Sequence, residues 1–278
     1  MTTLSNARRA RSLVRGLIAG AAVWVVAAPL PAAGQALDPT FTKDIAPILQ
    51  RSCQKCHRPN SLAPMSLITY DEVRPWARSI KNRTGLRNKM GAMPPWYIEK
   101  DIGIQRFKDD WSLSDDEIAT IAAWTDNGAP RGNPADMPTP PPFIDVDEWE
   151  IGQPDLIVSS GAVEVKGSAP DWWGSLGQAD SGLTEDRYVA AIEYKERNNL
   201  ERGVKTDTVG GLFVIHHSSV ATIGPEGSRR NLHIWPVHEV GRNADVFDEA
   251  AGVMLKAGST LMFSSTHLHS NGTDATAR

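Results

Sequence analysis

Prolines crowd the middle of this 278-residue chain and limit how it can fold. Segment 130–143 contains Pro130, Pro134, Pro138, Pro140, Pro141 and Pro142. Proline fixes φ and has no backbone N–H, so such a run is extended and cannot continue a helix or an inner strand. The sequence therefore predicts a linker at 130–143 between a region at 37–129 and a region at 144–278.

Helical patterns occupy the region before the linker. Apolar residues recur at helical spacing ahead of the first cysteine, at Phe41, Ile45, Ile48 and Leu49. A second helix is better marked, because Ser114 and Glu117 form a Ser-x-x-Glu capping box and Gly128 is placed to end the helix. We expect this region to be all-α.

Short apolar runs rich in β-forming residues follow the linker. They lie at 156–158, 188–192, 212–215, 232–235 and 260–263, and are bounded by Gly, Pro and Asn. Runs of this length and spacing are typical of antiparallel strands. The sequence predicts an antiparallel β-sandwich in the region 144–278.

The first 36 residues have the layout of a secretory signal peptide. Arginines at 8, 9, 11 and 15 precede an uncharged run at 17–30 and small residues that end at Ala36. We expect Sec export to the periplasm with cleavage after Ala36, an uncleaved membrane anchor being the alternative. Without this segment, 25 basic residues face 33 acidic ones, a formal charge of −8 that disfavours nucleic-acid binding.

Only two cysteines are present, in Cys53-Gln54-Lys55-Cys56, and His57 follows them directly. Two thiols at this spacing can reach both vinyl groups of a haem, and the next histidine can then bind the iron. The motif predicts covalent haem c on Cys53 and Cys56, with His57 as an axial ligand. A small disulfide or a dithiol redox site are the alternatives.

The second axial ligand must come from farther along the chain. Thioether sulfur is usual in electron-transfer cytochromes, which makes Met65, Met90 and Met93 the candidates. We favour Met93 over Met90, because Pro94 and Pro95 would stiffen its loop and Trp96 could pack on the haem. Met65 is expected to be core packing. An open or water-bound position is the remaining alternative.

From Asp38 to Gly128 the arrangement resembles a class I cytochrome c: an N-terminal helix, the Cys53–His57 motif, a methionine loop and a C-terminal helix. The resemblance implies an electron-transfer role. The expected fold class is therefore multidomain, an all-α cytochrome c domain followed by an antiparallel β-sandwich.

Six of the seven histidines lie between His216 and His269. Residues i and i+2 share one face of a strand, so His267 and His269 could present both imidazoles to one metal. Adjacent His216 and His217 would point to opposite faces, so joint binding requires a bulge or a strand end. Imidazole-only sites suit copper or zinc, and beside a haem we expect redox-active copper. The remaining two, His233 and His238, are expected to be ordinary polar residues.

The His216-His217 pair and the segment Phe263–Gly272 resemble the first copper site of the type II, ascorbate-dependent copper monooxygenases, the class of peptidylglycine α-hydroxylating monooxygenase. The resemblance implies His216, His217 and His267 as copper ligands, and it leaves open whether His267 or His269 is the third. Bacterial fusions of a cytochrome c region to such a copper region look most similar to the whole chain. The family's second copper subdomain has no counterpart, since the chain stops nine residues after His269, and we expect a truncated product.

Three functions are compatible with these patterns. In the first, an exported mono-haem cytochrome exchanges electrons with a periplasmic partner and passes them to copper in the second region. In the second, a copper monooxygenase hydroxylates a small organic or peptide substrate, with its second copper missing from this chain. In the third, the β-region is a sandwich that binds no metal. No catalytic residue is assigned.

Overall fold

The computed structural model describes residues 38–95, 99, 102–104, 107–108, 110–201, 211–228 and 232–278. These residues belong to one compact unit that extends to Arg278. The expected signal peptide at 1–36 lies outside the described residues. Within the described part of the chain, no helix is both long and apolar enough to span a bilayer.

The helices of the described residues are short and all lie before residue 137. They are η1 (Phe41–Ile45), α1 (Ala46–Ser52), α2 (Tyr70–Val73), η2 (Arg74–Trp76), α3 (Ala77–Gly85), α4 (Asp115–Asp126) and η3 (Pro134–Asp136). Their core is built around Phe41, Ile45, Leu49 and Trp124, all at most 1% exposed. The apolar spacing that predicted a helix ahead of the cysteines is confirmed by η1 and α1.

The capping box predicted at Ser114 is present at the start of α4. The Ser114 hydroxyl accepts a hydrogen bond from the Glu117 N–H at 3.2 Å, and the Glu117 carboxylate accepts one from the Ser114 N–H at 2.8 Å. Gly128 follows the helix with φ +84°, a conformation that glycine adopts without strain. Both predicted ends of this helix are confirmed.

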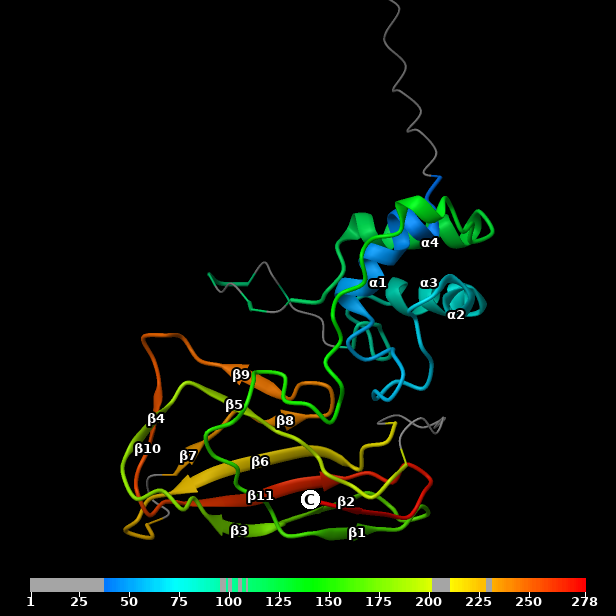
Figure 1. Cartoon of the computed structure of the whole chain (residues 1–278). Helices are drawn as coiled ribbons and strands as arrows, with labels where there is room; N and C mark the ends of the chain where they lie inside the picture. Colours follow the sequence, from blue (N-terminus) through cyan, green and yellow to red (C-terminus); the bar gives the residue numbers. More distant parts are fainter. Residues whose placement is uncertain are drawn as a thin grey trace, which may run out of the picture. The chain divides into compact units, whose positions relative to one another are not determined.

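Antiparallel strands follow residue 162. They are β1 (Val163–Val165), β2 (Trp172–Gly174), β3 (Gly177–Asp180), β4 (Arg187–Val189), β5 (Ala191–Glu193), β6 (Ile215–Ile223), β7 (His233–Ile234), β8 (His238–Glu239), β9 (Ala244–Val246), β10 (Val253–Leu255), β11 (Thr260–Leu268) and β12 (Ala275–Ala277). The largest sheet has the order β2-β11-β6-β7, with β3 also paired to β11 and β8 to β6. The long strands β6 and β11 run side by side through it (Figure 1).

The predicted strands match these elements unevenly. The runs at 188–192, 232–235 and 260–263 coincide with β4 and β5, with β7 and with the start of β11. The run at 212–215 only reaches the first residue of β6, and 156–158 forms no strand. Strands such as β2 and β3 escaped prediction because they are three or four mostly exposed residues long and carry no apolar alternation.

The expected fold class, an all-α cytochrome c domain followed by an antiparallel β-sandwich, is wrong as stated. Helices account for only 19% of the described chain and strands for 22%. The longest helix, α4, has 12 residues, and turns rather than helices fill most of the described residues between α1 and α2 and between α3 and α4. Those stretches contain Pro59, Asn60, Pro64 and Gly91, which favour turns. The several antiparallel sheets remain compatible with a sandwich.

The Ser114 cap gives a stability prediction. Replacing Ser114 with Ala leaves the Glu117 N–H without its acceptor, and we expect a loss of about 1 kcal/mol in the free energy of unfolding. Urea unfolding followed by circular dichroism measures it. Ser114→Asp keeps a side-chain acceptor at the cap and should retain most of the stability. Equal stability of the Ala variant and the wild type would contradict the assignment.

Candidate metal centre

A β-bulge between β6 and β11 brings two neighbouring histidines to one side of the sheet. His217 pairs with His267, but the next pair is Ile215 with Leu268, so His216 is the extra residue of β6. The bulge breaks the alternation that would send adjacent side chains to opposite faces. The sequence-based condition for joint metal binding by His216 and His217 is therefore met.

Three imidazoles converge at this bulge. Their ligand atoms, one each from His216, His217 and His267, all lie within 4.8 Å of one another. The Nδ1 atoms of His216 and His217 are 2.7 Å apart, and those of His217 and His267 are 3.3 Å apart. Bonds of about 2.0–2.1 Å at a tetrahedral angle place two ligand nitrogens about 3.3 Å apart. The cluster could hold a metal ion.

Carboxylates lie on the outer side of two of these rings. The Nε2 atom of His267 is 3.0 Å from the Asp171 carboxylate, and Nε2 of His217 is 4.0 Å from that of Glu239. His269 does not share the three-histidine cluster, and its Nδ1 lies 2.7 Å from the other Asp171 oxygen. Whether His269 also binds a metal stays a prediction.

A buried carboxylate fixes the start of β6. Glu196, 7% exposed, accepts hydrogen bonds from the backbone N–H groups of Val214 and Ile215, the latter at 2.7 Å. On the other side, the His269 N–H donates to the Val214 carbonyl at 2.9 Å. These contacts satisfy backbone groups that the bulge would otherwise leave unpaired, and they hold the strand end that carries His216.

The surroundings keep His216 in the form that binds metals. Burial, helped by the neighbouring histidines, lowers the pKa of His216 from 6.5 to about 4. A neutral imidazole has a lone pair for a metal, whereas a protonated one has none. The Asp171 carboxyl has a lowered pKa, chiefly because His269 and then His267 hydrogen-bond to it.

The remaining β-region histidines take no part in the cluster. His233 is exposed on β7, where its ring meets Trp235 edge to face. His238 on β8 is buried, 5% exposed, beside the ring of Tyr194, and its Nδ1 has no hydrogen-bond partner among the described residues. His238 is thus a buried imidazole.

The Cys53–His57 turn follows α1 directly. Both cysteines are free thiols, and burial raises the pKa of Cys53 to about 12 and raises that of Cys56 as well. Reactive dithiol motifs need a lowered thiol pKa. The raised pKa values of Cys53 and Cys56 therefore disfavour a dithiol redox site. His57 Nδ1 lies 3.2 Å from the Met65 carbonyl. An N–H donated there orients the ring and leaves Nε2 for a metal, the usual arrangement of a metal-binding histidine.

The candidate methionines differ in exposure. Met90 is 99% exposed and Met93 is 42% exposed, while Met65 packs against the helical core as expected. Trp96, which was expected to pack on the haem, lies outside the described residues. The sixth ligand, Met93 or Met90, therefore stays a prediction.

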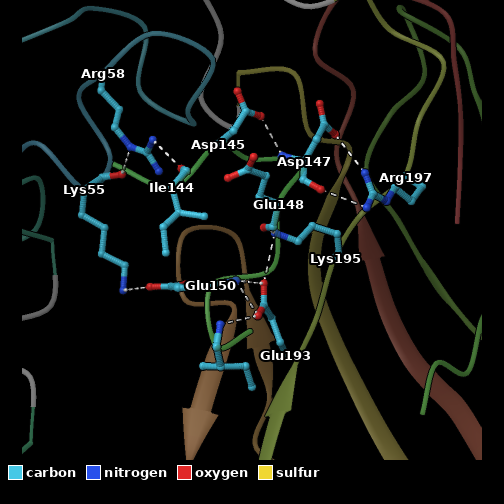
Figure 2. Close-up of polar contacts among 11 residues, drawn as sticks. Lys55, Arg58, Ile144, Asp145, Asp147, Glu148, Glu150, Glu193, Lys195 and Arg197 are labelled. Atoms are coloured by element: carbon cyan, nitrogen blue, oxygen red, sulfur yellow. Dashed lines mark hydrogen bonds and ion pairs between the residues drawn. The ribbon is translucent and has the colours of Figure 1, made fainter. Parts of the chain in front are cut away.

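Residues in and beside the cysteine turn contact the region that follows the proline-rich segment. Arg58 donates to the Ile144 carbonyl at 3.1 Å, and Lys55 lies 3.8 Å from the Glu150 carboxylate. The segment at 145–150 is tied in turn to the residues around β5, as Figure 2 shows: Glu193 accepts from the Glu150 N–H at 2.8 Å. Further contacts join Arg197 to Asp147 and Lys195 to the Glu148 carbonyl.

Comparisons of the chain with protein-family models, with curated proteins and with solved structures found no match. The functional argument therefore rests on the residues and their geometry.

Sequence reasoning missed several residues around the cluster. Trp173 lies in β2, a strand too short to predict, and Asp171 directly precedes it. The ring centroids of Trp173 and His267 are 4.1 Å apart, and the two rings are stacked with an interplanar angle of 4°. Glu196 and Glu239 are acidic residues with no motif around them. Only the pairing of β2 with β11 and of β8 with β6 brings Trp173 and Glu239 to the histidines.

Buried His238 gives a prediction for the pH dependence of stability. Burial lowers its pKa from 6.5 to about 4, so between these values the unfolded chain binds more protons than the folded one. The stability that neutral His238 permits is present above pH 6.5 and is lost as the pH falls towards 4, by roughly 3 kcal/mol. Urea unfolding of wild type and His238→Gln between pH 4.5 and 7.5 measures this.

The variant should lose less stability on acidification than the wild type does. His233→Gln, at an exposed position, is the matched control and should follow the wild type. A wild-type pH profile in His238→Gln would contradict the prediction.

Proposed function

We propose that this chain is an exported electron-transfer protein. Cys53 and Cys56 would hold a c-type haem that accepts one electron from a periplasmic donor, and His216, His217 and His267 would hold the copper ion that receives this electron. The transfer would balance at one electron, with ferrous iron oxidised to ferric iron and Cu(II) reduced to Cu(I).

The donor set supports copper at the cluster. Three imidazoles without a cysteine suit copper or zinc, and of these two metals only copper exchanges electrons. The two nearby carboxylates, Asp171 and Glu239, favour a cation in their vicinity.

The residues of the turn fit a covalently attached haem. Free thiols at positions 53 and 56 are available for thioether bonds, and the contact between His57 Nδ1 and the Met65 carbonyl presents Nε2 to an iron. Once bound, the haem supplies a one-electron couple.

One observation carries the proposal: a short chain of contacts joins the cysteine turn to the cluster. Gly241 packs so closely that a Cβ there would lie 3.6 Å from Cys56 Sγ and 2.5 Å from the side chain of Leu62. The adjacent Val240 N–H donates to the His216 carbonyl at 3.0 Å. These contacts run from Cys56, a proposed haem attachment site, to His216, a proposed copper ligand.

The test follows haem absorbance in copper-loaded protein without oxygen. After brief reduction of the haem in the Cu(II) form, we expect it to reoxidise as one electron per chain reaches copper. His216→Ala removes a ligand, so it should bind less copper and keep its haem reduced. Copper analysis and stopped-flow absorbance supply the two measurements.

His233→Ala is the matched control, because His233 is exposed and outside the cluster, and it should behave as the wild type. No copper uptake by the wild type, or wild-type kinetics in His216→Ala, would overturn the proposal. Cys56→Ser should lose one thioether bond, which the haem absorption spectrum reports.

A further inference from the structure

The two nitrogens of the His267 ring face different partners. Nε2 lies 3.0 Å from the Asp171 carboxylate, and Nδ1 lies 3.3 Å from Nδ1 of His217. A neutral imidazole has one N–H and one lone pair, and an ionised carboxylate only accepts. The carboxylate therefore keeps the proton on Nε2 and turns the lone pair of Nδ1 towards the cluster.

His269 contacts the other oxygen of the Asp171 carboxylate. Its Nδ1 lies 2.7 Å from Asp171 Oδ1, while His267 uses Oδ2. The His269 ring is also the more distant one, with its centroid 6.0 Å from that of His216, against 5.2 Å for His267. With Nδ1 directed at Asp171, only Nε2 of His269 could bind a metal, and His269 is not among the three histidines whose ligand atoms converge.

The segment that follows Asp171 also packs against the face of the His267 ring. Asp171 directly precedes β2, where Trp173 pairs with His267. The Trp173 indole lies parallel to the His267 ring at 4.1 Å. The carboxylate thus fixes His267 within the plane of its ring, and the indole fixes it from above.

We infer that Asp171 is the positioning residue of the metal centre and that His269 anchors Asp171 instead of binding the metal. This inference rests on the proposed function, and it selects His267 over His269 as third ligand. Asp171 also places a negative charge beside the metal, which stabilises Cu(II) relative to Cu(I).

The test compares copper affinity and copper potential in variants of the full chain. Asp171→Asn should weaken copper binding 10- to 100-fold in competition titrations, the usual cost of losing such a partner. It should also raise the Cu(II)/Cu(I) potential, a readout that loss of packing alone would not move in a defined direction. Asp171→Glu should recover part of both properties. Asp155→Asn, an exposed aspartate of the same region, is the matched control and should match the wild type.

His269→Ala separates anchor from ligand. The Cu(II) electron paramagnetic resonance spectrum of this variant should show as many coupled nitrogens as the wild type, whereas His267→Ala should lose one.

The outcomes distinguish the two proposals. If the wild type binds copper and Asp171→Asn binds it equally tightly at an unchanged potential, the inference about Asp171 is overturned and the proposed function stands. Loss of a coupled nitrogen in His269→Ala overturns the assignment of His269. If the wild type binds no copper, both proposals are overturned.

Discussion

The bulge at His216 is the feature on which the candidate site depends. A regular β6 would place His216 and His217 on opposite faces of the sheet, and no three-imidazole cluster would form. The single extra residue between the pairs His217–His267 and Ile215–Leu268 turns both rings to the same side. Glu196 satisfies the backbone N–H groups just ahead of the bulge, so the irregular backbone leaves those groups paired.

The strand pairing around the bulge also links the cluster to the rest of the molecule. β2 brings Trp173 and Asp171 to His267, and β8 brings Glu239 towards His217. Just past β8, Val240 bonds to the His216 carbonyl, and Gly241 packs against the cysteine turn. The same short segment that completes the surroundings of the cluster therefore contacts the residues proposed to carry haem.

The sequence predicted local features better than global ones. The Ser114 helix, the need for a bulge at His216-His217 and the start of β11 at Thr260 followed from capping chemistry, strand periodicity and β-forming residues. The all-α expectation failed because turn-forming residues interrupt the N-terminal region. The role of Asp171 could not be predicted from the sequence. It depends on the pairing of the three-residue strand β2 with β11, almost a hundred positions away, and no local pattern encodes that pairing.

The central claim is that one chain carries an electron from haem to copper internally. The most direct measurement is pulsed reduction of the copper-loaded protein, with the haem absorbance followed over a range of protein concentrations. Transfer within one chain predicts reoxidation with a first-order rate constant that does not change with protein concentration. A rate that rises in proportion to concentration, or a haem that stays reduced, would contradict the account.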